Sequence, residues 1–263
     1  IYFFHTFDLQ FVVYQLMKLK KSHIFLLLAL LFSGAFFSFL FTETDVKEKE
    51  AVLFIGNSYT YRNKGVDQHI QEFVTTSGNK SAIYSRAAQG KFHLYTHFKN
   101  AKTLLKFNQR QWDKVVLQEY SSGPIADKKS FFAYGQKWAN RIRKNNPNAK
   151  IYLYSTWGYK KSASMTDSVY SCYKELGEKI NATVIPVGNM WNKVQKKVNL
   201  YAGDNAHPNR KGTFLTACLF YEFLEGKDVR LTKHTDRKLP KWEQKKLKRL
   251  AHEFHRSWRK KNA

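Results

Sequence analysis

Residues 51–60 read AVLFIGNSYT, a short apolar run that ends at Gly56 and is followed at once by polar residues. A run of this length closed by a glycine is typical of a buried parallel strand. Gly56 allows the chain to turn sharply, which predicts that Ser58 lies near the start of the next helix. Backbone N–H groups at a helix start favour negative charge, so this position suits a nucleophilic hydroxyl. A serine that only caps the helix is the alternative interpretation.

The chain that follows alternates between strand-like and helix-like segments. Further strands are expected over Ser81–Ala87, Val115–Gln118, Lys150–Thr156 and Thr183–Val187. Helices are expected over Val66–Thr76, His93–Phe107, Ser130–Lys144, Asp167–Ile180 and Arg210–Leu224. This alternation predicts a five-stranded parallel sheet with helices on both faces, a three-layer α/β/α sandwich. Ligands of such sheets bind outside the carboxyl ends of the strands, so the residues just after each strand are the candidates for a site.

Three of these positions carry groups that suit acyl chemistry. Gly90 follows the second strand and can bring a backbone N–H close to a substrate, although an ordinary loop glycine explains it as well. Gln118 ends the third strand, where its carboxamide either donates to an oxyanion or bonds to nearby backbone. Asp204 stands three residues before His207 in GDNAHPN. That spacing lets a carboxylate accept the imidazole Nδ1–H and leaves Nε2 free to act as a base.

The combination of GNS after the first strand with D-x-x-H-P-N before the last helix resembles the SGNH (GDSL-like) hydrolase superfamily. The resemblance covers about residues 51–226, nearly all of the predicted sheet. It implies a flavodoxin-like fold in which Ser58 is the nucleophile, His207 the general base and Asp204 its orienting partner. It also implies an oxyanion hole that contains the backbone N–H groups of Ser58 and Gly90.

Two motifs depart from the usual pattern of this superfamily. The first block reads GNSYT, with Asn57 where an acidic residue is usual. The third block reads LQEYSSGP and lacks the usual Gly-x-Asn-Asp, so Gln118 is the expected substitute for the missing oxyanion donor. Together these features indicate a divergent branch with a GNS first block and an LQE third block.

The resemblance implies an esterase that removes short acyl groups, such as acetyl, from a glycan or another cell-envelope ester through an acyl-enzyme. No cofactor is expected, and no cluster with metal-ligand spacing is apparent in the sequence. Aromatic residues after the third and fourth strands, Tyr120, Trp157 and Tyr159, are expected to be exposed for sugar stacking or to be core or lid residues. The alternatives are an O-acyltransferase that uses the same triad and a non-catalytic module that binds anionic glycans or lipids.

The amino-terminal residues 1–42 have the order of a targeting segment. Lysines at 18, 20 and 21 precede an uncharged run from Ile24 to Phe41, and a polar stretch follows. This order is typical of a secretory signal, whereas a run of this length is also near that of an uncleaved membrane anchor. Met17 is the expected start of the signal, which leaves residues 1–16 upstream of it. Either form predicts export of the hydrolase-like domain, expected over residues 43–232.

The strongly basic composition favours anionic partners. Lys and Arg number 45 and Asp and Glu number 20, which gives a formal net charge of +25. The basic residues are spread along the chain without a recognised nucleic-acid module, so nucleic acid is not an expected partner. Solvated lysine faces explain the charge equally well.

The carboxyl-terminal segment 233–263 is expected to form a basic amphipathic helix. Its apolar stripe contains Leu247, Leu250, Ala251, Phe254 and Trp258. The stripe predicts a helix that packs on the domain, or one that lies on an anionic membrane surface. Cys172 and Cys218 fall within predicted helices and are expected to be buried thiols that form no bridge.

Overall fold

The computed structural model describes residues 50–78, 82–160, 162–233 and 236–262. Residues 49–263 form one compact unit. The predicted targeting segment, residues 1–42, lies outside the described residues. Among the residues that are described, no helix is both long enough and apolar enough to cross a membrane.

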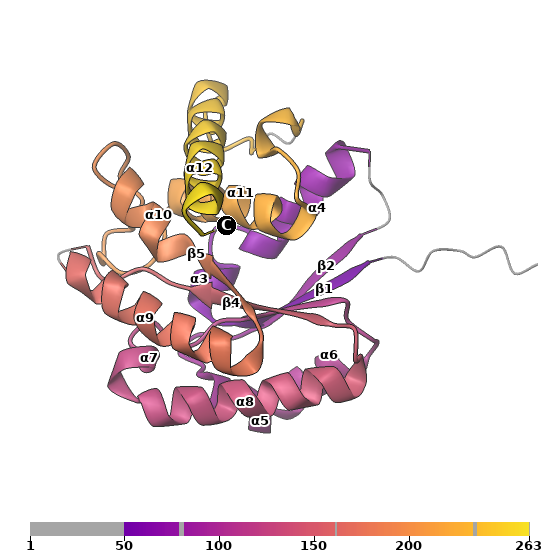
Figure 1. Cartoon of the computed structure of the whole chain (residues 1–263). Coiled ribbons are helices and arrows are strands. Elements are labelled where there is room, and N and C mark those ends of the chain that lie inside the picture. Colours follow the sequence, from indigo (N-terminus) through magenta and orange to yellow (C-terminus); the bar gives the residue numbers. More distant parts are fainter. Residues whose placement is uncertain (1–49, 79–81, 161, 234–235, 263) are drawn as a thin grey trace, which may run out of the picture. The chain divides into compact units, whose positions relative to one another are not determined.

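Five parallel strands form the sheet at the centre of the domain (Figure 1). They are β1 (Ala51–Gly56), β2 (Ile83–Ala88), β3 (Lys114–Leu117), β4 (Lys150–Ser155) and β5 (Thr183–Pro186). Their spatial order is β2-β1-β3-β4-β5, the flavodoxin-like order, which confirms the predicted fold class. The order of the strands reverses between β1 and β3, and it is outside this point that such sheets bind ligands.

Helices cover both faces of the sheet (Figure 1). On one face lie α4 (Val66–Thr76), α10 (Val187–Val194), α11 (Arg210–Glu225) and α12 (Lys241–Asn262). On the other lie α5 (Leu94–Lys99), α6 (Ala101–Asn108), α8 (Lys128–Asn145) and α9 (Ala163–Ile180). Two single turns, α3 (Ser58–Tyr61) and α7 (Gly123–Ala126), follow β1 and β3, and the 3₁₀ helix η1 (Val229–Leu231) follows α11.

The apolar side chains of β1 explain why helices must cover both faces of the sheet. Along β1, Leu53 and Ile55 belong to the hydrophobic cluster under α5, α6, α8 and α9, whereas Val52 and Phe54 belong to the cluster under α4 and α11. All six residues of β1 are buried. Burial of each large side chain of this kind stabilises the fold by about 1.5–3 kcal/mol, so neither face of β1 can be left open to water.

Two helices differ from the prediction. The segment predicted as one helix over 93–107 is broken into α5 and α6, because Asn100 has an extended backbone and its side chain accepts the N–H of Thr103 as a helix cap. The helix α10 follows β5 directly and was not predicted. Of the cysteines, both of which are free, Cys218 is buried as expected, whereas Cys172 is partly exposed on α9.

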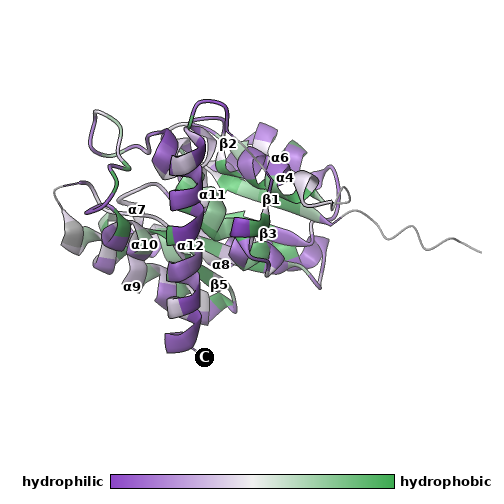
Figure 2. Ribbon diagram, turned by 90° about the horizontal axis from the view of Figure 1, so that it is seen from above, coloured by the Kyte–Doolittle hydropathy of each residue, from purple (hydrophilic) through white to green (hydrophobic). Residues whose placement is uncertain are grey.

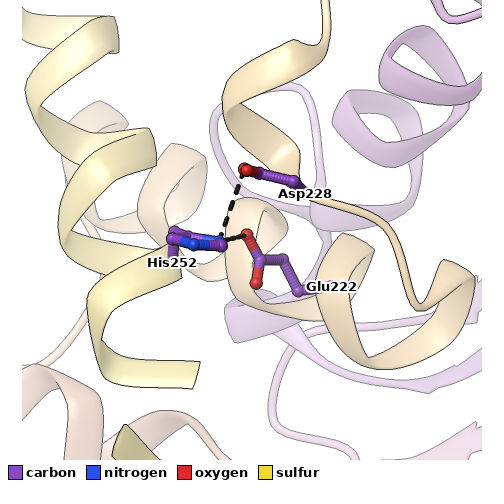
Figure 3. Close-up of side chains that lie close together, drawn as sticks. All are labelled: Glu222, Asp228 and His252. Atoms are coloured by element: carbon purple, nitrogen blue, oxygen red, sulfur yellow. Dashed lines mark hydrogen bonds and ion pairs between the residues drawn. The ribbon is translucent and has the colours of Figure 1, made fainter. Parts of the chain in front are cut away.

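The last helix, α12, packs on α11 and contributes to the core. Its predicted apolar stripe is used for this packing: Leu247, Leu250, Ala251 and Phe254 are buried. The buried carboxylate of Glu222 on α11 accepts from His252 Nδ1 at 2.9 Å and His255 Nδ1 at 2.7 Å. Asp228 lies 3.4 Å from the same nitrogen of His252 (Figure 3). These polar contacts fix the position of α12 along α11.

The end of β1 is held by a buried histidine on α5. His97 Nε2 lies 2.7 Å from the Gly56 carbonyl oxygen, and Nδ1 lies 2.8 Å from Thr103 Oγ1. Burial lowers the pKa of His97 to about 4, although the bond to the Gly56 carbonyl opposes this shift. The ring is therefore neutral near pH 7, and it fixes the backbone just before Ser58.

This burial makes the stability of the fold depend on pH in a defined window. Between pH 6.5 and pH 4 the unfolded chain binds a proton at His97 and the folded chain does not, so acidification favours unfolding. The shift to about 4 corresponds to about 3 kcal/mol lost across this window. Urea unfolding of the wild type at several pH values should show this loss, and His97→Gln, which cannot titrate, should show a smaller one. Identical pH dependence in both proteins would contradict this assignment.

Candidate active site

The structure brings Ser58, His207 and Asp204 together outside the carboxyl end of β1. Ser58 Oγ lies 2.9 Å from His207 Nε2, and His207 Nδ1 lies 2.5 Å from Asp204 Oδ2. Ser58 and His207 are 149 residues apart in the chain, so this contact depends on the whole fold. The three side chains form a continuous hydrogen-bonded series, an arrangement in which a carboxylate and an imidazole can activate a serine hydroxyl.

Asp204 is fixed by the loop that it shares with His207. Its Oδ1 accepts the backbone N–H groups of His207 at 2.9 Å and Ala206 at 3.1 Å, and Arg62 Nη1 lies 3.9 Å from Oδ2. Burial raises the pKa of this carboxyl, but the N–H donors and the His207 ring outweigh it and lower the pKa to about 2. The carboxylate is therefore ionised at neutral pH and accepts the Nδ1–H, which leaves the Nε2 lone pair directed at Ser58.

A small pocket of about 130 Å³ opens at Ser58. Its walls come from the loops after β1, β2, β3 and β4 and from the loop that carries His207. The lining residues are Asn57, Ser58, Tyr59, Lys91, Tyr120, Ser121, Tyr159, Ala206 and His207. The pocket therefore lies where the carboxyl ends of the parallel strands meet, as predicted for a doubly wound sheet.

Gln118 has a different role from the one predicted. Its Oε1 accepts the Asn57 backbone N–H and the Thr60 hydroxyl, both at 2.9 Å. Its Nε2 donates to Asn57 Oδ1 at 2.9 Å and to the Glu119 carbonyl at 2.7 Å. Both amide hydrogens are thus engaged, and Gln118 does not supply a donor to an oxyanion in this structure. Gly56 permits this arrangement, because a Cβ there would come within 2.5 Å of Gln118 Oε1.

Glu119 is a site residue that the sequence analysis did not identify. Its buried carboxylate accepts the backbone N–H of Leu94 at 3.0 Å and of Tyr120 at 2.7 Å, and lies 2.8 Å from His93 Nδ1. Asn57 Nδ2 donates to the Phe92 carbonyl at 3.1 Å. The loops after β1, β2 and β3 are therefore joined by one buried polar network. Two consecutive polar residues directly after the apolar run Val115–Leu117 were the signal in the sequence.

Gly90 lies in the turn that follows β2, next to Lys91, which lines the pocket. Lys91 has a φ of 63°, so the turn passes through the left-handed region at that residue. Among the hydrogen bonds of the described residues, none uses the backbone N–H of Gly90 or of Ser58. Both groups can therefore donate to a bound oxygen, and the oxyanion role of Gly90 stays a prediction.

Trp157 is buried, which agrees with the core alternative of the sequence analysis and not with sugar stacking. Its exposed fraction is 0%, and its ring stacks between Tyr59 and Trp191 at centroid distances of 4.5 and 3.6 Å. Its Nε1 donates to the Ala206 carbonyl at 2.9 Å. Trp157 thus fixes the residue before His207 and has no free face for a sugar. Tyr120 and Tyr159 do line the pocket and are partly exposed or exposed.

One group of side chains in the described part of the chain has donor atoms close enough to hold a metal ion: Glu222, Asp228 and His252. It joins α11 to α12 and shares no residue with the pocket at Ser58. Asp228 is also paired with Arg230, whose Nη2 lies 2.7 Å from Asp228 Oδ2.

Comparison with known proteins gives matches to solved structures alone. No protein-family model and no curated protein matches the chain. A DUF4886 family protein from Bacteroides uniformis superposes with a TM-score of 0.63 at 16% identity, over 78% of this chain and 93% of its own. A candidate SGNH hydrolase from Slackia heliotrinireducens gives 0.57 at 22% identity, over 66% and 98%.

An acetylxylan esterase from Geobacillus stearothermophilus gives a TM-score of 0.53 at 16% identity, over 68% of this chain and 95% of its own. These similarities span nearly the whole length of each solved structure. At these identities they establish the architecture. The chain therefore has the fold of the SGNH hydrolases.

Proposed function

We propose that this protein is an exported serine esterase that removes short acyl groups from a carbohydrate or another cell-envelope ester. The observation that carries the proposal is the series Ser58–His207–Asp204, joined by two hydrogen bonds at the mouth of a pocket. A module that only binds a glycan has no need of a serine hydroxyl held against an imidazole that is held in turn by a carboxylate. The fold supports the same conclusion.

The reaction proceeds in two halves. As Ser58 Oγ attacks the ester carbonyl carbon, its proton passes to His207 Nε2, and Asp204 stabilises the imidazolium that results. The C–O bond to the leaving alcohol then breaks, and that oxygen takes the proton from His207. A water molecule, deprotonated by His207, attacks the acyl-enzyme and releases the carboxylic acid, which restores Ser58.

The tetrahedral oxyanion is held by backbone donors in this proposal. The N–H groups of Ser58 and Gly90 are the candidates, because neither is used within the described residues. Gln118 does not contact the oxyanion in this proposal. It holds the Asn57 backbone, and in this way it fixes the direction of the Ser58 N–H. Loss of one such donor typically raises the barrier by about 3 kcal/mol, so the rigidity of this turn matters for the rate.

The size and lining of the pocket support a short acyl group. A volume of about 130 Å³ is well below the roughly 300 Å³ at which pockets for drug-sized ligands begin. Tyr120 and Tyr159 line the pocket beside Ser58 and offer aromatic faces to the alcohol part of the ester. A sugar ring suits such faces, and one structure with this fold is an acetylxylan esterase. Export follows from the expected signal or anchor at residues 1–42.

Hydrolysis of p-nitrophenyl acetate by the full chain in mild detergent tests the nucleophile. Ser58→Ala should abolish turnover and leave the circular dichroism spectrum and the unfolding midpoint unchanged, because Ser58 is only partly buried and its hydroxyl hydrogen-bonds, among the described residues, to His207 alone. Ser122→Ala, in the loop after β3, is the matched control and should retain full activity. Equal rates for wild type and Ser58→Ala would overturn the proposal. Addition of a sugar acceptor, with product analysis, separates hydrolysis from acyl transfer.

Substitution of Asp204 tests whether the carboxylate orients the base. The Asp204 carboxylate is ionised at neutral pH and holds the His207 tautomer, so Asp204→Asn should lower kcat by about 10⁴ at pH 8. Asp127→Asn removes a carboxylate that caps α8 and does not line the pocket, so it should change kcat little. Initial rates at saturating ester measure both effects. A loss of less than tenfold for Asp204→Asn would contradict the role given to this residue.

Trp157 provides a test of positioning. Trp157→Phe keeps an aromatic ring in the stack but removes the N–H that holds Ala206, so kcat should fall by about tenfold with little change in KM. Trp112→Phe is the matched control: it removes a buried indole hydrogen bond of 2.8 Å to the Phe107 carbonyl, beyond the amino end of β3. If both variants lose the same activity, the effect reflects stability and the positioning role of Trp157 is wrong.

A further inference from the structure

A second pocket, of about 440 Å³, lies beside the first half of α12. It is formed by η1, the loop after it and the first half of α12, and shares no residue with the pocket at Ser58. Six of its lining side chains are basic and none is acidic. The lining residues are Arg230, Thr232, Lys233, Lys241, Gln244, Lys245, Lys248 and Arg249. Figure 2 shows α12 as hydrophilic along most of its length.

The pocket has a positively charged floor and rim. Lys248 is buried, and its Nζ donates to the Thr232 carbonyl at 2.9 Å and to Thr232 Oγ1 at 2.7 Å. At the rim, Arg230 and Arg249 have carboxylates near them, those of Asp228 at 2.7 Å and Glu253 at 3.7 Å. Lys241 and Lys245 have no carboxylate within ion-pair distance among the described residues. The rim therefore keeps a net positive charge toward solvent.

Two large apolar side chains flank this pocket and are exposed. Leu231, which follows Arg230, is 79% exposed, and Trp242, which follows Lys241, is 65% exposed. Scattered apolar residues on a surface are ordinary, but a tryptophan and a leucine beside a cluster of cations form a distinct chemical pattern. Tryptophan favours the headgroup level of a bilayer, and clustered Lys and Arg favour anionic lipid. A soluble polyanion would use the charge and leave the apolar side chains in water.

We propose that this surface, Arg230, Leu231, Lys233, Lys241, Trp242, Lys245 and Arg249, binds the face of a bilayer that contains anionic phospholipid. Lipid phosphates occupy the basic pocket, while Trp242 and Leu231 enter the interface. We call these seven residues the basic-aromatic surface. The inference differs from the sequence-based alternative for residues 233–263: the stripe of Leu247, Ala251 and Phe254 is used in the core, and a different set of side chains meets the lipid.

The connection to the amino-terminal segment is consistent with this surface. Eight residues, 42–49, separate the apolar run that ends at Phe41 from Glu50, the first described residue. An extended chain of this length spans at most about 30 Å. If the run from Ile24 to Phe41 remains in the membrane as an anchor, it therefore holds the domain within that distance of the lipid, where a weak headgroup-binding surface is sufficient to orient it.

Hydrogen–deuterium exchange of the full chain in lipid nanodiscs tests the proposal. Discs of phosphatidylcholine alone are compared with discs in which about a quarter of the lipid is phosphatidylglycerol. Peptides that cover residues 229–245 should exchange about fivefold more slowly in the anionic discs, and the difference should vanish near 0.5 M salt because surface attraction is screened. Equal exchange in both kinds of disc would overturn the proposal.

Three variants and a competing polyanion identify the side chains and the ligand responsible for the protection. Lys241→Gln/Lys245→Gln/Arg249→Gln should lose the lipid-dependent protection. Lys144→Gln/Lys174→Gln/Lys179→Gln removes the same number of positive charges from α8 and α9 and should keep the lipid-dependent protection. Protection that persists in the first variant, or that is lost in the second, contradicts the proposal. Leu231→Ser/Trp242→Ser should also weaken the protection. If soluble polyphosphate protects residues 229–245 and anionic discs do not, the surface binds a polyanion and the membrane assignment is wrong.

Discussion

The buried carboxamide of Gln118 is the interaction on which the site depends. It accepts the backbone N–H of Asn57 and donates to the Asn57 side chain, and so joins the end of β3 to the end of β1. Ser58 follows immediately, and its direction toward His207 depends on this turn. A polar side chain buried in this way is costly unless all its hydrogen bonds are made, and here they are. Residue 56 must be a glycine for the same reason, because no Cβ fits there beside the Gln118 carboxamide.

The rest of the site extends this arrangement. Glu119 joins the end of β3 to the loop after β2, and Trp157 joins the loop after β4 to the residue before His207. Each of these groups acts on a backbone segment and leaves the triad side chains free for chemistry. Ser58 thus follows a turn held by buried hydrogen bonds, whereas the Asp204 side chain is close to solvent. Asp204 stays ionised there because backbone N–H groups hold its carboxylate.

Much of the fold could be predicted from the sequence, since its strongest local patterns are those that the core uses. The strand Ala51–Gly56 and the helix Val66–Thr76 were predicted to the residue, because apolar periodicity and terminal glycine agree there. The break at Asn100 was missed because an asparagine within a helical pattern can either continue the helix or cap a new one. The prediction for Gln118 failed because the direction of its side chain depends on the space at Gly56. The sequence could not choose between an exposed and a core Trp157, because the loop that covers it comes 49 residues later in the chain.

We propose that His207 and Asp204 make the Ser58 hydroxyl nucleophilic. Treatment of the folded full chain with a fluorophosphonate, followed by intact mass spectrometry and peptide mapping, tests this without any knowledge of the natural ester. We expect one phosphonate per chain, located on Ser58, and we expect the label to be lost both in His207→Ala and after unfolding. A chain that is not labelled, or is labelled at another serine with the same speed as at Ser58, would contradict it.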